Sequence, residues 1–157
     1  MDRLDLASRE LPGAHVVVLE LDSVGGEEFE MRRLEPKGYV EAAGDTMLAV
    51  FGLKGEVVRA GKLRLWMVNH RYAVEVAGNG ETAFLDPRRV GANSTVEVFE
   101  VERGGSEMVH VKTFSSGVVD TPNNLWLTGE GGFFVTNDHS AKGIWRFSLP
   151  SCHLFSM

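Results

Sequence analysis

Three features of this 157-residue sequence predict an all-β fold. Short runs rich in β-branched and aromatic residues recur along the chain, and several of them alternate apolar with polar residues. Clusters of Gly, Asn, Asp and Pro separate these runs, and a sustained helical period is nearly absent. Regular strands at such short spacing are typical of a sandwich, a barrel or a propeller.

The expected strands follow one another closely from residue 15 onwards. They lie near His15–Leu21, Glu28–Leu34, Met47–Phe51, Leu63–Asn69, Thr95–Val101, Glu107–Phe114, Leu125–Thr128, Phe133–Thr136 and Ile144–Phe147. The clearest hairpin joins residues 95–101 to residues 107–114 through a loop that contains Gly104 and Gly105.

This hairpin also carries the clearest alternation. Val96 and Val98 alternate with Glu97, which is typical of a half-buried strand. In the following strand His110 stands between two valines, and we expect it to face solvent while they face the core.

Four segments organise the chain. We expect an N-terminal tail at residues 1–13, a β-rich body at residues 14–147 and an atypical tail at residues 148–157. Within the body, residues 71–93 have no sustained period and carry Gly78-Asn79-Gly80 and Asp86-Pro87, which predicts a long surface loop. Two interpretations of the C-terminal tail stay open: a natural terminal strand or tail, or non-native sequence after an early stop, which we favour.

Composition excludes several classes of partner. The net charge is −6, and the densest basic stretches are the pairs Arg32-Arg33 and Arg88-Arg89, so nucleic acid and anionic membranes are not expected partners. The apolar run at residues 16–19 has the length of a strand, and no signal peptide or membrane segment is visible. Cys152 is the single cysteine, which leaves the compartment undetermined.

Three polar segments at strand ends are candidates for chemistry. His70 ends a strand and is placed as a general base, or as a rim histidine bonded to a loop carbonyl. Asn123 and Asn124 precede a strand and offer hard oxygen donors for Ca²⁺, or form an ordinary turn after proline. Asp138 and His139 are possible metal or acid–base groups, or a polar turn. The sequence lacks zinc, phosphate-loop, nucleophile-elbow and EF-hand patterns, so any calcium ligands must be scattered through the fold.

Taken together, these segments resemble the paraoxonase/arylesterase family of calcium-dependent lactonases and phosphotriesterases. The resemblance is carried, in the family's order, by Leu65-Trp66-Met67-Val68-Asn69-His70, Asn93-Ser94-Thr95-Val96-Glu97-Val98-Phe99-Glu100, Val109-His110-Val111-Lys112-Thr113, Asn123-Asn124-Leu125-Trp126-Leu127-Thr128-Gly129 and Phe133-Phe134-Val135-Thr136-Asn137-Asp138-His139. It covers residues 63–147 well and residues 14–62 weakly. Residues 71–93 look like an insertion relative to the animal members.

The resemblance implies a six-bladed β-propeller of four-stranded blades, related to gluconolactonase-like propellers. A full member is more than twice as long, so we expect this chain to form about two blades of an incomplete propeller. Such an arc exposes strand edges that a closed propeller removes, and we therefore expect a truncated product.

The resemblance also assigns calcium ligands. Asn123 matches a ligand of the catalytic Ca²⁺ in the central tunnel. Asn124 stands where the family usually has an Asp that binds a second, structural Ca²⁺, and Leu53 matches a residue whose backbone carbonyl contacts that ion. The family's early Glu-Asp pair has no match here and its later ligands lie beyond residue 157, so weak calcium binding is expected.

The histidine dyad is altered. His70 matches the outer histidine, and Asp138 with His139 match a pair near the tunnel mouth. The inner, base-like histidine is replaced by Phe51, at the family's spacing of 19 residues from His70.

In the family, Ca²⁺ polarises the carbonyl or phosphoryl oxygen of an ester, lactone or organophosphate, and a histidine-activated water attacks. A phenyl ring cannot accept a proton, so we expect no such hydrolysis by this chain. Two alternatives are a non-catalytic propeller module that pairs or self-associates through open strand edges, and a fragment without a function of its own.

Overall fold

The structure, a computed structural model, describes residues 16–21, 29–40, 48–71, 74–80, 82–85, 93–117, 119, 121–137 and 151–156. Every regular element within these ranges is a strand, so the all-β prediction is confirmed. The strands are β1 (Val16–Leu21), β2 (Phe29–Lys37), β3 (Val50–Arg59), β4 (Lys62–Arg71), β5 (Val74–Val76), β6 (Thr82–Phe84), β7 (Asn93–Glu102), β8 (Glu107–Phe114), β9 (Pro122–Leu127), β10 (Gly132–Asn137) and β11 (Ser151–Ser156).

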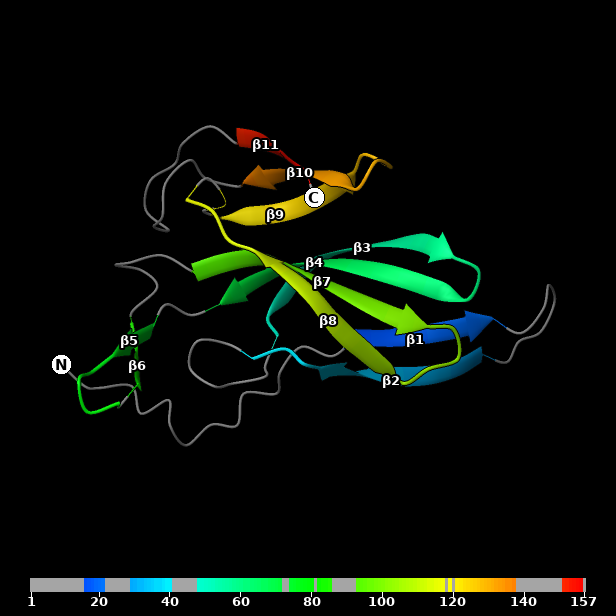
Figure 1. Cartoon of the computed structure of the whole chain (residues 1–157), viewed down its shortest axis with the longest axis horizontal. Coiled ribbons are helices and arrows are strands. Elements are labelled where there is room, and N and C mark those ends of the chain that lie inside the picture. Colours follow the sequence, from blue (N-terminus) through cyan, green and yellow to red (C-terminus); the bar gives the residue numbers. More distant parts are fainter. Residues whose placement is uncertain are drawn as a thin grey trace.

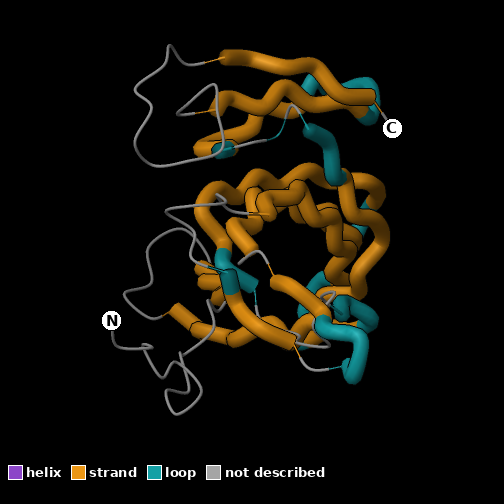
Figure 2. Tube along the Cα trace, turned by 90° about the vertical axis from the view of Figure 1, so that its left-hand side faces the viewer, coloured by secondary structure: helices purple, strands orange, loops and turns teal. Residues whose placement is uncertain are grey.

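The main sheet is six-stranded and mixed. Its order is β1-β2-β8-β7-β4-β3, and every neighbouring pair is antiparallel except β2 and β8, which run parallel over three residue pairs. The sheet curls into a half-barrel, and a smaller sheet of order β11-β10-β9 lies above it (Figures 1 and 2). A curled sheet of this kind leaves β1 and β3 as its two edges.

An antiparallel meander forms one side of the main sheet. Strands β3, β4, β7 and β8 follow one another in sequence and in space, with the small β5–β6 hairpin inserted between β4 and β7. The turn between β3 and β4 needs Gly61, whose φ is +80°. Residues 71–93, predicted as a loop, therefore contain a short hairpin of three-residue strands, which are too short to show a period in the sequence.

Strand β4 is buried on both faces. Leu65 and Met67 pack into one hydrophobic cluster, inside the half-barrel, with residues of β1, β2, β7 and β8. Trp66 and Val68 pack into a second cluster with residues of β9 and β10. The three-stranded sheet is therefore fixed to the outer face of the half-barrel by a core of its own.

The predicted orientation of His110 was wrong. Val109 and Val111 are exposed, and His110 points to the inside of the half-barrel, on the same face of β8 as buried Met108. Val98 pairs with Lys112 and Phe99 pairs with His110, so Val111 is an extra residue on β8.

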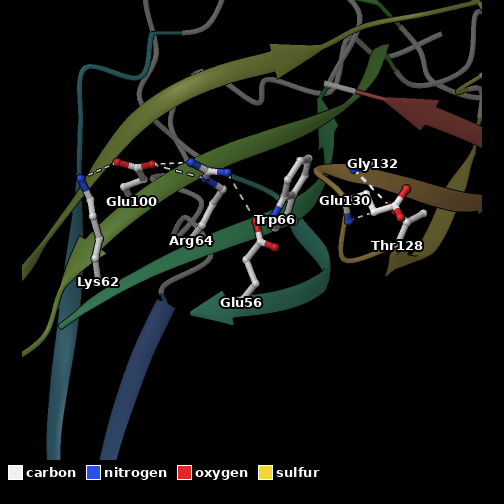
Figure 3. A network of polar contacts seen from close by, with 8 residues as sticks. All are labelled: Glu56, Lys62, Arg64, Trp66, Glu100, Thr128, Glu130 and Gly132. Atoms are coloured by element: carbon white, nitrogen blue, oxygen red, sulfur yellow. Dashed lines mark hydrogen bonds and ion pairs between the residues drawn. The ribbon is translucent and has the colours of Figure 1, made fainter. Parts of the chain in front are cut away.

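A row of charged side chains crosses β3, β4 and β7 (Figure 3). Lys62 Nζ lies 2.6 Å from Glu100 Oε2, Arg64 Nη2 lies 2.8 Å from Glu100 Oε1, and Arg64 Nη1 lies 3.5 Å from Glu56. The indole N–H of Trp66 donates to Glu56 at 3.1 Å. The hydrogen bond from Lys62, followed by that from Arg64, lowers the pKa of Glu100, and the same bond to Glu100 raises the pKa of Lys62.

The predicted strands are found with changed bounds. β3 continues to Arg59, well past the predicted end at Phe51, because pairing with β4 extends the strand through Gly52 and Gly55. β9 begins at Pro122, so Asn123 and Asn124 lie within a strand and the turn interpretation was wrong. Residues 151–156 form β11 and pair with β10, whereas residues 144–147 lie outside the described ranges.

Candidate functional site

The candidate site lies where the start of β3, the end of β4 and the start of β9 meet. The ring of Phe51 stacks on the ring of His70, with centroids 4.8 Å apart and planes 18° apart. The two residues face each other because Phe51 is the extra residue of a bulge opposite β4, between the pairs of Val50 with Asn69 and of Gly52 with Val68. The structure thus brings together the two positions that the sequence analysis linked.

The ring of His70 also contacts strand β9 through a hydrogen bond. Nε2 of His70 donates to the carbonyl oxygen of Pro122 at 2.5 Å. This bond places the proton of His70 on Nε2 and directs that nitrogen at backbone. This bond is the one expected of a rim histidine, and it leaves Nδ1 as the ring nitrogen that can accept a proton.

Gly52 permits the close approach of β3 and β9. A β-carbon built on Gly52 would lie 2.9 Å from the carbonyl oxygen of Asn123 and 3.5 Å from Oδ1 of Asn124. Contacts of 2.9 Å to backbone are not tolerated, so a side chain at this position would push the two strands apart.

Asn69 anchors the end of β4 beside His70. It is fully buried; its Nδ2 donates to the hydroxyl oxygen of Tyr39 at 2.7 Å, and its Oδ1 accepts the amide N–H of Ala49 at 2.8 Å. The amide of His70 donates to the carbonyl of Ala49 at 3.0 Å. These bonds hold the backbone of His70 in place while its ring contacts β3 and β9.

The predicted calcium ligands are close together but do not fit the ion. Oδ1 of Asn124 already accepts the amide N–H of Leu125 at 2.9 Å, and the backbone carbonyl of Asn124 accepts the hydroxyl of Thr136 at 3.3 Å. Asn123 is exposed and can offer a neutral amide oxygen. In the described part of the chain, no three His, Cys, Asp or Glu side chains gather as a metal cluster. Ca²⁺ sites need several oxygen ligands including carboxylates, so this donor set is too small and uncharged.

Two further predictions concern Leu53 and the pair Asp138 and His139. The side chain of Leu53 is 43% exposed on β3, opposite Met67 of β4. Asp138 and His139 lie outside the described residues, directly after the end of β10 at Asn137.

A second polar cluster, inside the half-barrel, was missed by the sequence analysis. Glu97 on β7 is fully buried, and its carboxylate accepts hydrogen bonds from Thr95 at 2.5 Å, Thr113 at 2.5 Å and Nε2 of His110 at 3.0 Å. Glu97 alternates with valines in β7, a pattern that is typical of a half-buried strand with its polar residues in solvent. Its burial results from the curling of β8 and β2 over this face of the sheet.

The rings of Tyr39 and Phe99 pack against the ring of His110 on the apolar side of the cluster. The centroid of the His110 ring lies 5.3 Å from that of Tyr39 and 5.1 Å from that of Phe99. Because Tyr39 also binds Asn69, the buried cluster and the end of β4 share a partner. Glu97 accepts three bonds at its two oxygens, which satisfies the charge within the protein and leaves the group structural.

The sequence matches no family model and no curated protein. Within the ranges that the structure describes, no helix has the length and apolar character to cross a membrane.

Proposed function

We propose that this chain is a two-blade segment of a paraoxonase-like propeller that does not hydrolyse esters by itself. The observation that carries the proposal is the stacking of Phe51 on His70, at 4.8 Å, in the place where the resemblance puts a second histidine. With Phe51 at this place, no second histidine assists His70, whose Nε2 donates to the carbonyl of Pro122 and leaves Nδ1 as its proton acceptor.

The strand order supports the two-blade interpretation. The meander β3-β4-β7-β8 has the four consecutive antiparallel strands of one blade, and β9-β10-β11 has three strands of a second blade packed on it. The first strands of the two units, β3 and β9, approach each other at Gly52 and Asn123. Inner strands of neighbouring blades meet in this way around the axis of a propeller.

Calcium would supply a Lewis acid to a full propeller of this kind by polarising the oxygen of an ester or lactone. Among the described residues, this chain provides the neutral side chains of Asn123 and Asn124 and backbone carbonyls at the corresponding place, and Oδ1 of Asn124 already accepts the amide N–H of Leu125. The chain's own residues therefore bring the strands together without providing charge for the ion, and calcium is expected to have little effect on the fold.

Phenyl acetate hydrolysis and thermal unfolding test this proposal together. We expect the purified chain to show no hydrolysis above buffer, and a cooperative melting transition by circular dichroism that Ca²⁺ and EDTA leave unchanged. Hydrolysis that EDTA abolishes, or a melting temperature that rises with calcium, would contradict it. Phe51→His is the matched variant, and it also stays inactive because it restores one histidine and no calcium ligand.

A second function is favoured by the free edge of the main sheet. β3 ends the sheet order, and it exposes 63% of Phe51 and 73% of Val57. Long exposed edges with apolar side chains recruit further strands. We propose that the chain acts as an interaction module that pairs through such an edge.

A further inference from the structure

The free part of the β3 edge is the segment from Leu53 to Arg59. Among the described strands only β4 pairs with β3, and β9 covers the beginning of β3 near Gly52. Beyond that point the strand keeps a clear alternation. Leu53 and Val57 lie opposite Met67 and Leu63 on one face, and Lys54 and Glu56 lie on the other face.

This segment is complementary to itself when it is reversed. In an antiparallel pair centred on Gly55, Leu53 of one chain lies opposite Val57 of the other, and Lys54 lies opposite Glu56. By symmetry each contact occurs twice, so the pair holds two apolar contacts on one face and two opposite-charge contacts on the other. Gly55 meets its own copy at the centre, where no side chain hinders the approach of the two backbones.

Other registers are less favourable. A shift that centres the pair on Lys54 or on Glu56 places like charges directly opposite each other at the two-fold axis. A shift by one residue pairs odd with even positions, and then Leu53 faces Glu56 and apolar residues change faces. The alternation and the charge order therefore select a single register.

From these observations we infer that β3 pairs antiparallel with β3 of a second copy of this chain, in a two-fold register centred on Gly55. The inference rests on the second function proposed above and names its partner. It makes a twelve-stranded continuous sheet from two six-stranded ones. The strand-edge interface is small, so the dimer is expected to be weak and to dissociate on dilution.

Charge exchange across the pair tests the register. Sedimentation velocity of the full chain between about 5 and about 200 µM covers the affinities expected of small interfaces. We expect a concentration-dependent dimer of the unmodified chain, and about tenfold weaker dimers of Lys54→Glu and of Glu56→Lys, each of which faces like charges twice. A mixture of these two variants restores opposite charges in both pairs, so it forms a heterodimer more readily than either variant alone.

Control variants separate this contact from general charge effects. Arg103→Glu and Glu75→Lys change the net charge by the same amounts on exposed positions outside β3, and both should dimerise like the unmodified chain. Glu56 also contacts Trp66 and Arg64, so circular dichroism of Glu56→Lys checks its fold. The heterodimer keeps the test decisive, because an unfolded variant cannot rescue its partner.

Disulfide trapping gives a second readout of the same register. In a Cys152→Ser background, Gly55→Cys places two cysteines directly opposite each other, at about the 5 Å Cα separation that a disulfide spans. Val57→Cys leaves its copies four positions apart, about 13 Å along the strands, and should not cross-link. The β-carbon at position 55 meets Leu65 at an ordinary 3.6 Å, so the strand accepts the cysteine.

The possible failures are distinguishable. A dimer that the charge variants leave intact would overturn the β3 register while keeping the interaction-module function. A chain that stays monomeric across the whole range would overturn both. Neither result bears on ester hydrolysis, which is measured separately.

Discussion

Glu97 and His110 form a buried acid–base pair across β7 and β8, with Oε2 of Glu97 3.0 Å from Nε2 of His110. Glu97 is completely buried, yet its carboxylate is satisfied by His110 and by the hydroxyls of Thr95 and Thr113. A buried carboxylate with such partners joins β7 to β8, because all four residues come from these two strands and His110 and Thr113 flank the bulge.

Glu97→Ala is therefore expected to be among the most harmful single substitutions in the protein. It leaves Thr95 and His110 without their acceptor inside the half-barrel and opens a cavity, at a cost of about 2–4 kcal/mol in the free energy of unfolding. Urea unfolding monitored by circular dichroism measures this cost. Glu102→Ala, at an exposed position of the same strand, is the control and should change stability by less than about 0.5 kcal/mol. Equal effects of the two substitutions would show that the cluster is not a structural centre.

The approach of β3 to β9 gives a second prediction, which compares two glycines of one strand. Gly52→Ala places a methyl group 2.9 Å from the carbonyl oxygen of Asn123, so β9 must move, and we expect a loss of about 1–3 kcal/mol. Gly55→Ala places its methyl group 3.6 Å from the Leu65 side chain, which is ordinary contact, and should be nearly neutral. Thermal melts of the two variants decide the matter, and a Gly52→Ala protein as stable as Gly55→Ala would refute the packing of the two units.

The stacking of Phe51 on His70 is open to a direct spectroscopic test. Phe51 is 63% exposed, so Phe51→Ala is expected to cost only about 0.5–1 kcal/mol of stability. The proton resonances of the His70 ring, however, should move downfield when the ring current of Phe51 is removed. Phe134→Ala, on β10, is the matched control and should leave the His70 resonances in place. Unchanged His70 shifts in Phe51→Ala would show that the rings do not stack in solution.

The sequence predicted the strands of this fold better than their surroundings. Strands β4, β7 and β8 were located because each carries several apolar or β-branched residues next to a glycine-containing turn. The length of β3 was missed because Gly52 and Gly55 read as breaks. Gly52 is required because β9 approaches the backbone of β3 at this position. The local sequence pattern does not reveal such a contact.

The candidate site was predictable in part. The link between Phe51 and His70 came from their spacing and from a resemblance, and the two side chains do meet. The burial of Glu97 and the inward turn of His110 were not predictable, because both depend on which faces of β7 and β8 the curled sheet encloses and on the parallel pairing of β2 with β8. These contacts join residues far apart in sequence, and alternation along a single strand carries no information about them.

The charged row on β4 and β7 predicts how stability depends on pH. The pKa of Glu100 lies below its usual value of 4.5 in the folded chain, because Lys62 and Arg64 donate to its carboxylate. Since the folded pKa is lowered, the contribution of Glu100 is fully present above pH 4.5 and is lost as pH falls through the folded pKa. The pKa of Lys62 is raised above 10.5, so its contribution is present below that pH and is lost only as pH rises through the folded value.

Glu100→Gln removes the acidic part of this dependence. We expect the melting temperature of the variant to be lower than that of the unmodified chain near neutral pH, and the two to converge as pH falls through the lowered folded pKa of Glu100. The difference should be modest and should shrink in high salt, because the pair is partly exposed. Glu102→Gln is the control on the same strand, since its carboxylate is 63% exposed and 3.5 Å from Lys62. A difference between Glu100→Gln and the unmodified chain that stays constant as the pH is lowered from neutral until the unmodified chain unfolds would mean that the loss comes from packing and not from the charge of Glu100.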